Sequence, residues 1–397
     1  MNRSEVWKIN LTALGVSQFI YRAGSRSLIP FLPLFIQDLG KTNFESTALW
    51  SGWIFAAPFI VSFFTTPLWG SFGDRFGRKL MTLLAVFGFA ASQMLMGISA
   101  NLLMLFIFSS LQEALGGFYP AAVSLTAANT PEEKSSYALG MIQFANSAGN
   151  VTGPVIGGIL AAVFGYREVF YLVGISSALA GIIVLIFVRE EKFEPETKSF
   201  YSITNNIKYL LDKKVLLSCG LFLLIYSLSV SLLRPTFSLF IQSLHFEGSL
   251  SATTGILLGI YGAFSALSSA LFGKFSERKN LRTFFILTIL MASASSFLIM
   301  YASSILSLSV LLAVSGFSLG LILPLIYTIL TRNIDRERKS GIFGIGSSFS
   351  TVGSLSGSIL SGIVVSNMGA AFPFAVSAFL FLFVVPISIL GLKETSH

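Results

Sequence analysis

The chain has 397 residues, of which 54% are hydrophobic and only 11% are charged, whereas about 25% of residues are charged in ordinary soluble domains. This composition excludes a soluble enzyme and a disordered chain, because so few charges cannot cover so much apolar surface in water. A single cysteine, Cys219, excludes an intramolecular disulfide, and two histidines leave no Cys/His cluster for a metal. The sequence therefore predicts an all-α, multi-pass membrane protein without a metal or cofactor.

Spanning a bilayer takes roughly 20 apolar residues in a helix. Windows of that size, separated by polar or charged turns, predict twelve transmembrane helices at residues 9–38, 47–72, 79–99, 101–127, 136–163, 166–188, 214–243, 250–275, 281–302, 305–330, 339–366 and 370–392. The N-terminus is basic, as in a signal peptide, but the apolar run behind it is too long and has no small-residue cleavage site. We therefore interpret this first run as a transmembrane helix.

The longest polar interruption separates these spans into six and six. It predicts an N-terminal six-helix bundle at residues 1–188, a cytoplasmic linker at 189–213 and a C-terminal six-helix bundle at 214–397.

The distribution of Lys and Arg predicts the orientation of the chain. With a cytoplasmic N-terminus, the outer loops contain only Lys41 and Arg167, and three arginines, Arg22, Arg26 and Arg234, lie within spans. All other basic residues then fall in inner loops and termini, as the positive-inside rule requires. Both termini are therefore expected in the cytoplasm, and the net charge of +8 needs no nucleic-acid partner.

The two halves of the sequence repeat each other at a nearly constant offset. Pro30–Gln37 returns as Pro235–Gln242, and Leu68–Phe72 returns as Leu271–Phe275. Residues of the same type also recur 204 positions after Pro120, Gly140, Gly149, Gly153, Gly158 and Phe170. Two parallel six-helix repeats predict a pseudo-two-fold axis along the membrane normal, a central site near the midplane and transport by alternating access.

Two glycine-rich strings carry further information. Residues 70–79 read Gly-Ser-Phe-Gly-Asp-Arg-Phe-Gly-Arg-Lys, in which glycines permit a tight turn at a helix end and the acid can lie against a positive helix N-terminus. Residues 149–158 read Gly-Asn-Val-Thr-Gly-Pro-Val-Ile-Gly-Gly. Small residues at this spacing let helices approach closely, and the proline bends the span.

The first string resembles motif A of the major facilitator superfamily, and the second resembles motif C of its drug:proton antiporters. Residues 49–52, 116–120 and 137–140 are similar to the multidrug resistance protein G group of that branch, and the resemblance covers essentially the whole chain. The resemblance implies the twelve-helix major facilitator fold. It implies that motif A holds the inner loops together in the outward-facing state, at Gly70, Asp74, Arg75, Gly77 and Arg78. It implies that motif C helps to seal the closed end, at Gly149, Gly153, Pro154, Gly157 and Gly158.

Glu113 is the only acidic residue deep within a predicted span, whereas Asp38 lies at the outer end of the first span. An ionised carboxylate at the bilayer centre is costly, so Glu113 is expected to bind a proton unless a cation compensates its charge. We therefore predict Glu113, followed by Asp38, as the proton-coupling residue. A structural ion pair is the alternative for Glu113. Ser109 occupies the position where the drug antiporters carry the arginine of motif B.

The three arginines within spans predict the charge of the substrate. Arg22 and Arg26 share one face of the first span, and Arg234 lies in the seventh. The resemblance implies that both spans, with the fourth and the tenth, line one cavity. Guanidinium groups keep their protons and bind carboxylate or phosphate through bidentate hydrogen bonds, which favours an anion. The alternatives are pairing of Arg22 with Glu113 and extension of the Arg234 side chain to the outer interface.

Other polar and aromatic side chains within spans either line the same cavity or join helices. They are Gln18, Tyr21, Gln112, Tyr119, Gln143, Asn146, Asn150, Tyr226 and Tyr327. We predict substrate contacts at Gln112, Tyr119, Gln143 and Asn146.

The sequence predicts a secondary active transporter, and not an enzyme, in the bacterial inner membrane. Its expected activity is proton-coupled export of a small anionic or amphipathic molecule, such as a drug-like compound or a citrate-type siderophore. Its expected partners are that solute, protons and lipid, with the chain acting as a monomer. The alternatives are an importer or facilitator of an anionic metabolite, and a non-transporting sensor or lipid-handling protein. The sequence contains no nucleotide-binding motif that would support an ATP-driven pump.

Overall fold

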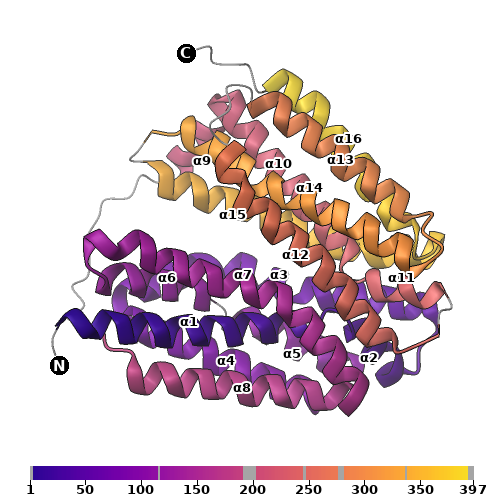
Figure 1. Cartoon of the computed structure of the whole chain (residues 1–397), viewed down its shortest axis with the longest axis horizontal. Coiled ribbons are helices and arrows are strands. Elements are labelled where there is room, and N and C mark those ends of the chain that lie inside the picture. Colours follow the sequence, from indigo (N-terminus) through magenta and orange to yellow (C-terminus); the bar gives the residue numbers. More distant parts are fainter. Residues whose placement is uncertain are drawn as a thin grey trace. The chain divides into compact units, whose positions relative to one another are not determined.

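The computed structural model describes residues 3–114, 117–190, 203–244, 247–275, 281–335 and 338–391. Within its helices the backbone alone is described at several positions, including residues 66–75 and 113–114. The described part of the chain forms α-helices numbered α1 to α16 and contains no strand (Figure 1). Ten of these helices are long and apolar enough to cross a membrane. The chain is therefore a multi-pass membrane protein with an all-α fold, as its sequence predicted.

The chain forms two compact units. The first comprises Met1–Thr42, Ala57–Thr197 and Gly248–Gly259. It contains most of α3 (Phe44–Phe76) and the helices α1 (Arg3–Ser27), α2 (Leu32–Gly40), α4 (Arg78–Gly97), α5 (Leu102–Ala114), α6 (Phe118–Asn129), α7 (Glu132–Phe164) and α8 (Tyr166–Phe187).

The second unit comprises Asn43–Ala56, Lys198–Glu247 and Ile260–His397. It contains most of α12 (Leu250–Phe275) and the helices α9 (Ile203–Asp212), α10 (Lys214–Leu233), α11 (Phe237–Ser243), α13 (Leu281–Ile299), α14 (Ile305–Arg332), α15 (Lys339–Met368) and α16 (Phe372–Gly391). Thus α3 and α12 each have their first part in one unit and the remainder in the other. The domain boundaries at residues 188 and 214 stay a prediction.

Two predicted spans are each interrupted at a proline. Pro30 lies in the turn between α1 and α2, and Pro235 lies in the turn between α10 and α11. A proline has no N–H to donate and disfavours helical backbone at the residue before it. The predicted spans at residues 9–38 and 214–243 are therefore each divided into two helices, and the two breaks match each other as the repeat predicts.

The predicted span at residues 101–127 is also two helices, α5 and α6, whereas its counterpart α14 is continuous. Gly117 precedes α6 with a φ of +122°, a conformation that residues with a side chain rarely adopt. Leu321 occupies the corresponding position in the second repeat and lies inside α14. The glycine at this one position permits the break, and the leucine does not.

Buried aromatic side chains form much of the interior of the first unit. Tyr21 of α1 packs against Phe89 of α4 and Phe118 of α6, with ring centroids 4.7 and 5.0 Å apart. Phe31 and Phe170 are both fully buried and meet edge to face at 5.6 Å. In a bilayer such close packing, rather than expulsion of water, holds helices together.

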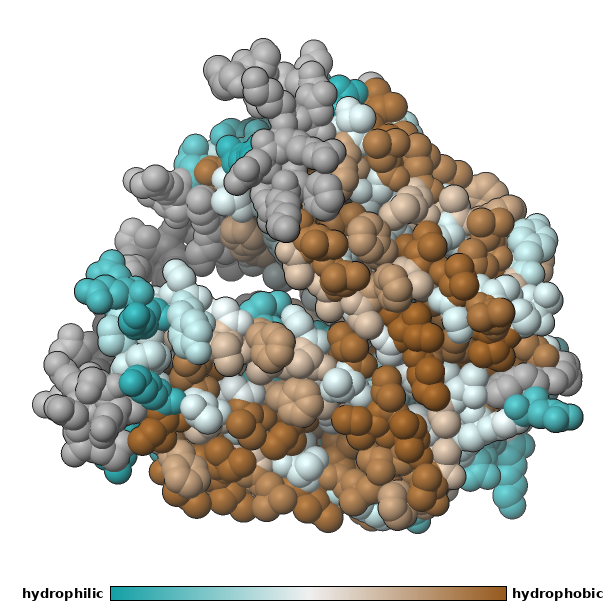
Figure 2. Space-filling model, viewed as in Figure 1, coloured by the Kyte–Doolittle hydropathy of each residue, from teal (hydrophilic) through white to brown (hydrophobic). Residues whose placement is uncertain are grey.

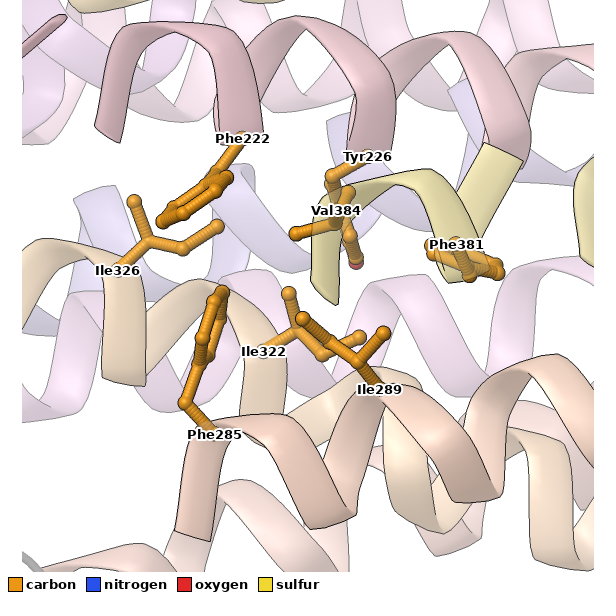
Figure 3. Close-up of a pocket in the computed structure, with 8 residues that line it drawn as sticks. All are labelled: Phe222, Tyr226, Phe285, Ile289, Ile322, Ile326, Phe381 and Val384. Carbon is orange, nitrogen blue, oxygen red and sulfur yellow. The ribbon is translucent and has the colours of Figure 1, made fainter. Parts of the chain in front are cut away.

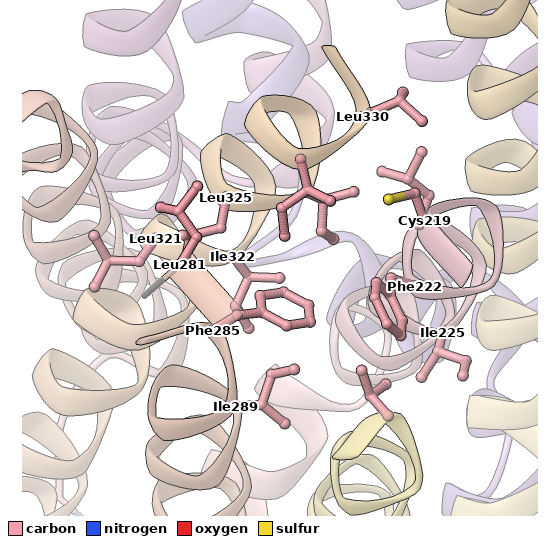
Figure 4. Packing of buried hydrophobic residues seen from close by; sticks show 14 of the residues in the cluster. Cys219, Phe222, Ile225, Leu281, Phe285, Ile289, Leu321, Ile322, Leu325 and Leu330 are labelled. Atoms are coloured by element: carbon pink, nitrogen blue, oxygen red, sulfur yellow. The ribbon is translucent and has the colours of Figure 1, made fainter. Parts of the chain in front are cut away.

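The interior of the second unit is an apolar cluster around α10, α13 and α14 (Figure 4). Eight side chains surround a cavity of about 10 Å³ (Figure 3), namely Phe222, Tyr226, Phe285, Ile289, Ile322, Ile326, Phe381 and Val384. That volume is close to the minimum that one water molecule needs. Because none of these eight side chains is charged, the cavity does not suit a charged substrate.

Apolar side chains also cover much of the outer surface (Figure 2). On α8 the exposed residues are Leu172, Ile175, Leu179, Ile182, Leu185 and Ile186, and on α16 they are Phe379, Leu382 and Phe383. Water-soluble monomers rarely expose contiguous apolar surface on this scale. These faces of α8 and α16 therefore contact lipid.

Candidate functional site

In the first unit, α7 packs closely against α1 (Figure 1). A Cβ atom added at Gly149 would lie 2.8 Å from Cβ of Arg22, and one at Gly153 would lie 2.8 Å from Cβ of Arg26. Such short contacts leave no room for a larger residue, so the two glycines set the separation of the helices. The glycines of the motif C string thus hold α7 against the part of α1 that carries the two arginines.

Two hydrogen bonds between side chains join α1 and α7. Gln18 Nε2 donates to Asn146 Oδ1 at 3.0 Å, and both residues are buried. Arg26 Nε donates to Asn150 Oδ1 at 2.9 Å. Four polar residues that the sequence placed within spans are therefore brought together at one helix pair.

A third polar group lies between α6 and α7. Tyr119 donates a hydrogen bond to Gln143, and the positive charge of Arg22 acts on the Tyr119 hydroxyl. Gln143 is exposed in this structure. The structure thus places Tyr119 and Gln143 beside α1, with Arg22 and Arg26 one helical turn apart on it.

Gln112 of α5 accepts a hydrogen bond from Gln93 Nε2 of α4 at 3.1 Å, so it joins two helices. Glu113 follows it near the end of α5, and its side chain lies outside the described part of the structure. The role of Glu113 therefore stays a prediction. Asp38 is exposed on α2, where its charge acts on the hydroxyl of Tyr166 at the start of α8.

Arg234 belongs to the second unit. It caps the C-terminus of α10, directly before Pro235, and is half-buried. Two residues later, the hydroxyl oxygen of Thr236 lies 2.6 Å from that of Ser361 on α15, in a buried hydrogen bond. This hydrogen bond joins the turn that contains Arg234 to α15.

The motif C string also has a second packing face. A Cβ atom at Gly158 would lie 3.0 Å from Cα of Gly255 in the first part of α12, and one at Gly255 would overlap the carbonyl oxygen of Pro154. On the opposite side, a Cβ atom at Gly157 would overlap the backbone of Ser27 in α1. Helix α7 therefore contacts α1, which carries the two arginines, on one side and the first part of α12 on the other.

The loop between α3 and α4 is a single residue, Gly77, with a φ of +93°. The carboxylate of Glu190 accepts hydrogen bonds from the backbone N–H groups of Arg78 and Lys79, at 2.8 and 3.0 Å. The Arg78 guanidinium donates in turn to the backbone carbonyl of Ser124 on α6, at 3.3 Å. The negative charge of Glu190 thus lies at the positive N-terminus of α4.

The other motif A residues, Gly70, Asp74 and Arg75, lie in the final turns of α3, where the backbone alone is described. Their roles stay predictions. Because α3 continues to Phe76, Gly77 makes the tight turn expected of the motif A glycines, and Gly70 lies within the helix.

Glu190 is a structural residue that the sequence did not single out, because it lies in the predicted linker at residues 189–213. Its neighbour Arg189 exchanges two hydrogen bonds with Asn10 of α1, at 2.8 and 2.9 Å. Its position in the sequence could have indicated this role. An acid directly after the sixth span lies on the same side of the membrane as the start of the third span.

The two units of apolar helices, the matching proline breaks and the arginine that Asn150 holds between α1 and α7 are features of a polytopic membrane transporter. The chain matches the family model of the Major Facilitator Superfamily at residues 14–254 and 219–397. It belongs to the Major Facilitator Superfamily, as the two motifs predicted, and is a transporter rather than an enzyme.

Curated relatives match the chain over nearly its whole length. It is 30% identical over 395 residues to Multidrug resistance protein MdtG of Enterobacter lignolyticus (strain SCF1), covering 98% of this chain and 93% of that protein. It is 31% identical over 385 residues to Multidrug resistance protein MdtG of Escherichia coli (strain SMS-3-5 / SECEC), covering 95% and 93%.

Solved transporters share its fold. A bacterial homologue of the human lysosomal transporter Spinster, in an inward-facing and occupied conformation, matches with a TM-score of 0.77 and 15% identity over 96% of each chain. The human organic anion transporter MFSD10 (TETRAN) matches with a TM-score of 0.70 and 17% identity, over 96% of this chain and 99% of that chain. These similarities confirm the predicted major facilitator fold.

Proposed function

We propose that this transporter exports a small anionic or amphipathic molecule in exchange for protons. The name of the curated relatives, Multidrug resistance protein MdtG, supports export of drug-like compounds. A carboxylate metabolite such as a citrate-type siderophore is a second substrate that fits the same charge requirement.

The observation that carries this proposal is the position of the two arginines on α1. Arg26 is bonded to Asn150, and the charge of Arg22 acts on the Tyr119 hydroxyl, all within the first unit. Guanidinium groups keep their charge and bind carboxylate or phosphate through bidentate hydrogen bonds. This chemistry favours an anionic substrate. Gln112, Gln143 and Asn146 supply further hydrogen-bonding groups on neighbouring helices.

Arg234 supplies a cation from the second unit in this proposal. Its place beside the proline break of α10 corresponds to the break after α1 in the first unit. Arg234 is a proposed substrate contact because its guanidinium can bind carboxylate or phosphate.

Glu113 is the proposed proton carrier, with Asp38 as the second candidate. In this scheme Glu113 binds a proton in one state and releases it in the other, which drives substrate in the opposite direction. The exposed position of Asp38 on α2 favours Glu113, because a group in contact with solvent is less dependent on the state of the transporter.

Motif A and motif C act on the conformational equilibrium in this proposal. Gly70, Asp74, Arg75, Gly77 and Arg78 stabilise the inner loops when the site is open to the outside. The motif C residues Gly149, Gly153, Pro154, Gly157 and Gly158 let α7 approach its neighbours closely and seal the closed end.

We place the protein in the bacterial inner membrane as a monomer, with both termini in the cytoplasm. The positive-inside distribution of Lys and Arg supports this orientation. It also accounts for the basic composition without a nucleic-acid partner.

Transport by purified protein in liposomes tests the proposal. With an imposed pH gradient of either sign, citrate and benzoate should move against the proton flux, and the lipophilic cation ethidium should move poorly. Movement of the anions with the proton flux would favour an importer. Efficient transport of ethidium without binding of either carboxylate would overturn the anion proposal. Failure of every solute to move would favour a sensor.

A further inference from the structure

Asn150 of α7 accepts a hydrogen bond from the guanidinium of Arg26. The Cβ atom of Arg26 lies beside Gly153, one turn further along α7. Side chains on a helix point back toward its N-terminus, so the Arg26 side chain runs back along α1 and reaches Asn150. The absence of a side chain at Gly153 leaves space for the aliphatic part of Arg26. The 2.9 Å bond from Nε to Oδ1 therefore follows from the register of the two helices.

The partner of Nε is a neutral amide. Asn accepts the hydrogen bond through its carbonyl oxygen but carries no charge. A guanidinium is planar, so one bond to Nε, together with the packed stem, restricts the direction in which its terminal nitrogens point. An aspartate of nearly the same shape would accept the same bond and cancel the charge of Arg26. An aliphatic residue would leave the charge and lose the orientation.

We propose that Asn150 is a positioning residue that orients Arg26 and preserves its positive charge, and thereby sets the preference of the transporter for anions. This inference rests on the proposed function, in which arginines of α1 bind an anionic substrate. Asn150 acts through Arg26 and does not itself bind the anion.

The inference predicts different outcomes for two substitutions that keep the size of the side chain at position 150 nearly constant. In Asn150→Asp, the new carboxylate neutralises Arg26, so anion affinity falls by about tenfold or more, while ethidium binds as well as or better than in the wild type. In Asn150→Leu, Arg26 keeps its charge and loses its orientation, so anion affinity falls less. If Asn150 were purely structural, both substitutions would reduce folding stability and would weaken the binding of anions and cations alike.

The experiment measures dissociation constants of citrate, benzoate, inorganic phosphate and ethidium for the full-length protein in nanodiscs. The variants are Asn150→Asp, Asn150→Leu, Arg26→Gln and the double variant Asn150→Leu with Arg26→Gln. Thr152→Val is the matched control, because the Thr152 hydroxyl on the same helix bonds only to the helix's own backbone in this structure, at Ala148. Thermal unfolding of each variant identifies any that fail to fold.

The double variant tests whether Asn150 acts through Arg26. If it does, Asn150→Leu changes anion affinity by less than about twofold once Arg26 is already glutamine, because coupled residues are not additive. Additive losses would show that Asn150 binds the anion directly and would overturn the positioning role. Unchanged selectivity in Asn150→Asp, with a loss of affinity in Arg26→Gln, would overturn the inference and leave the proposed function intact. A wild-type protein that binds none of the three anions overturns both.

Discussion

The carboxylate of Glu190 lies 2.8 Å from the backbone nitrogen of Arg78, at the first residue of α4. Gly77, the residue before α4, has no side chain with which to cap the helix. The carboxylate accordingly comes from a residue more than a hundred positions away, beyond the end of α8. The motif A loop is thus tied to the first residues after the sixth span.

We predict that Glu190→Ala destabilises the first unit by about 1–2 kcal/mol, because the first amides of α4 lose their acceptor and the helix dipole loses its counter-charge. Thermal unfolding in detergent and hydrogen exchange at residues 78–82 measure this effect. Glu133→Ala is the control, since Glu133 is an exposed carboxylate in the first turn of α7. Equal unfolding temperatures for the two variants would contradict the capping role.

The glycine packing of α7 predicts a second contrast between two variants. At Gly153 an added Cβ would lie 2.5 Å from the carbonyl oxygen of Ala23, whereas at Gly140 it would meet nothing within 4 Å. Gly153→Ala should therefore destabilise the protein by about 1–3 kcal/mol through overpacking. Gly140→Ala should be neutral or stabilising by about 0.5–1 kcal/mol, because alanine favours a helix over glycine.

Thermal unfolding and transport rates for both alanine variants measure this contrast. If Gly153→Ala unfolds at the temperature of the wild type and transports normally, α1 and α7 do not need the close approach seen here.

Glu113→Gln should abolish proton-driven transport while the protein remains folded and inserted in the membrane. Glutamine keeps the size of the side chain but cannot exchange a proton, so substrate exchange at equal pH should persist. Uptake driven by a pH gradient in inverted vesicles, compared with substrate exchange at equal pH, separates the two activities. Asp38→Asn serves as the comparison, and full gradient-driven transport by Glu113→Gln would assign proton coupling to Asp38 instead.

Asp74→Asn should lower the maximal transport rate and leave substrate affinity nearly unchanged. Asp74 lies near the C-terminal end of α3, so we expect it to act on the equilibrium between conformations. Initial rates over a range of substrate concentrations provide the test. A normal maximal rate with weakened binding would instead show that Asp74 affects the substrate site.

Much of this protein was determined by its sequence alone. Long apolar windows with few charges allow no fold but membrane-spanning helices, because lipid cannot satisfy exposed backbone groups. The recurrence of Pro30 as Pro235 revealed the internal repeat, and the glycine-rich strings identified the superfamily. These features are local or periodic in the sequence. They can therefore be recognised without knowing how each helix is rotated about its axis.

The tertiary structure decided which side chains meet. Arg26 and Asn150 are separated by 124 residues, and their hydrogen bond depends on the rotation and register of α1 against α7. The cap of α4 by Glu190 depends on where the sixth span ends relative to the third. Hydropathy and spacing place a residue at a depth and on a helix, but they do not specify the neighbouring helix that it faces. Close packing of the helices determines that neighbour.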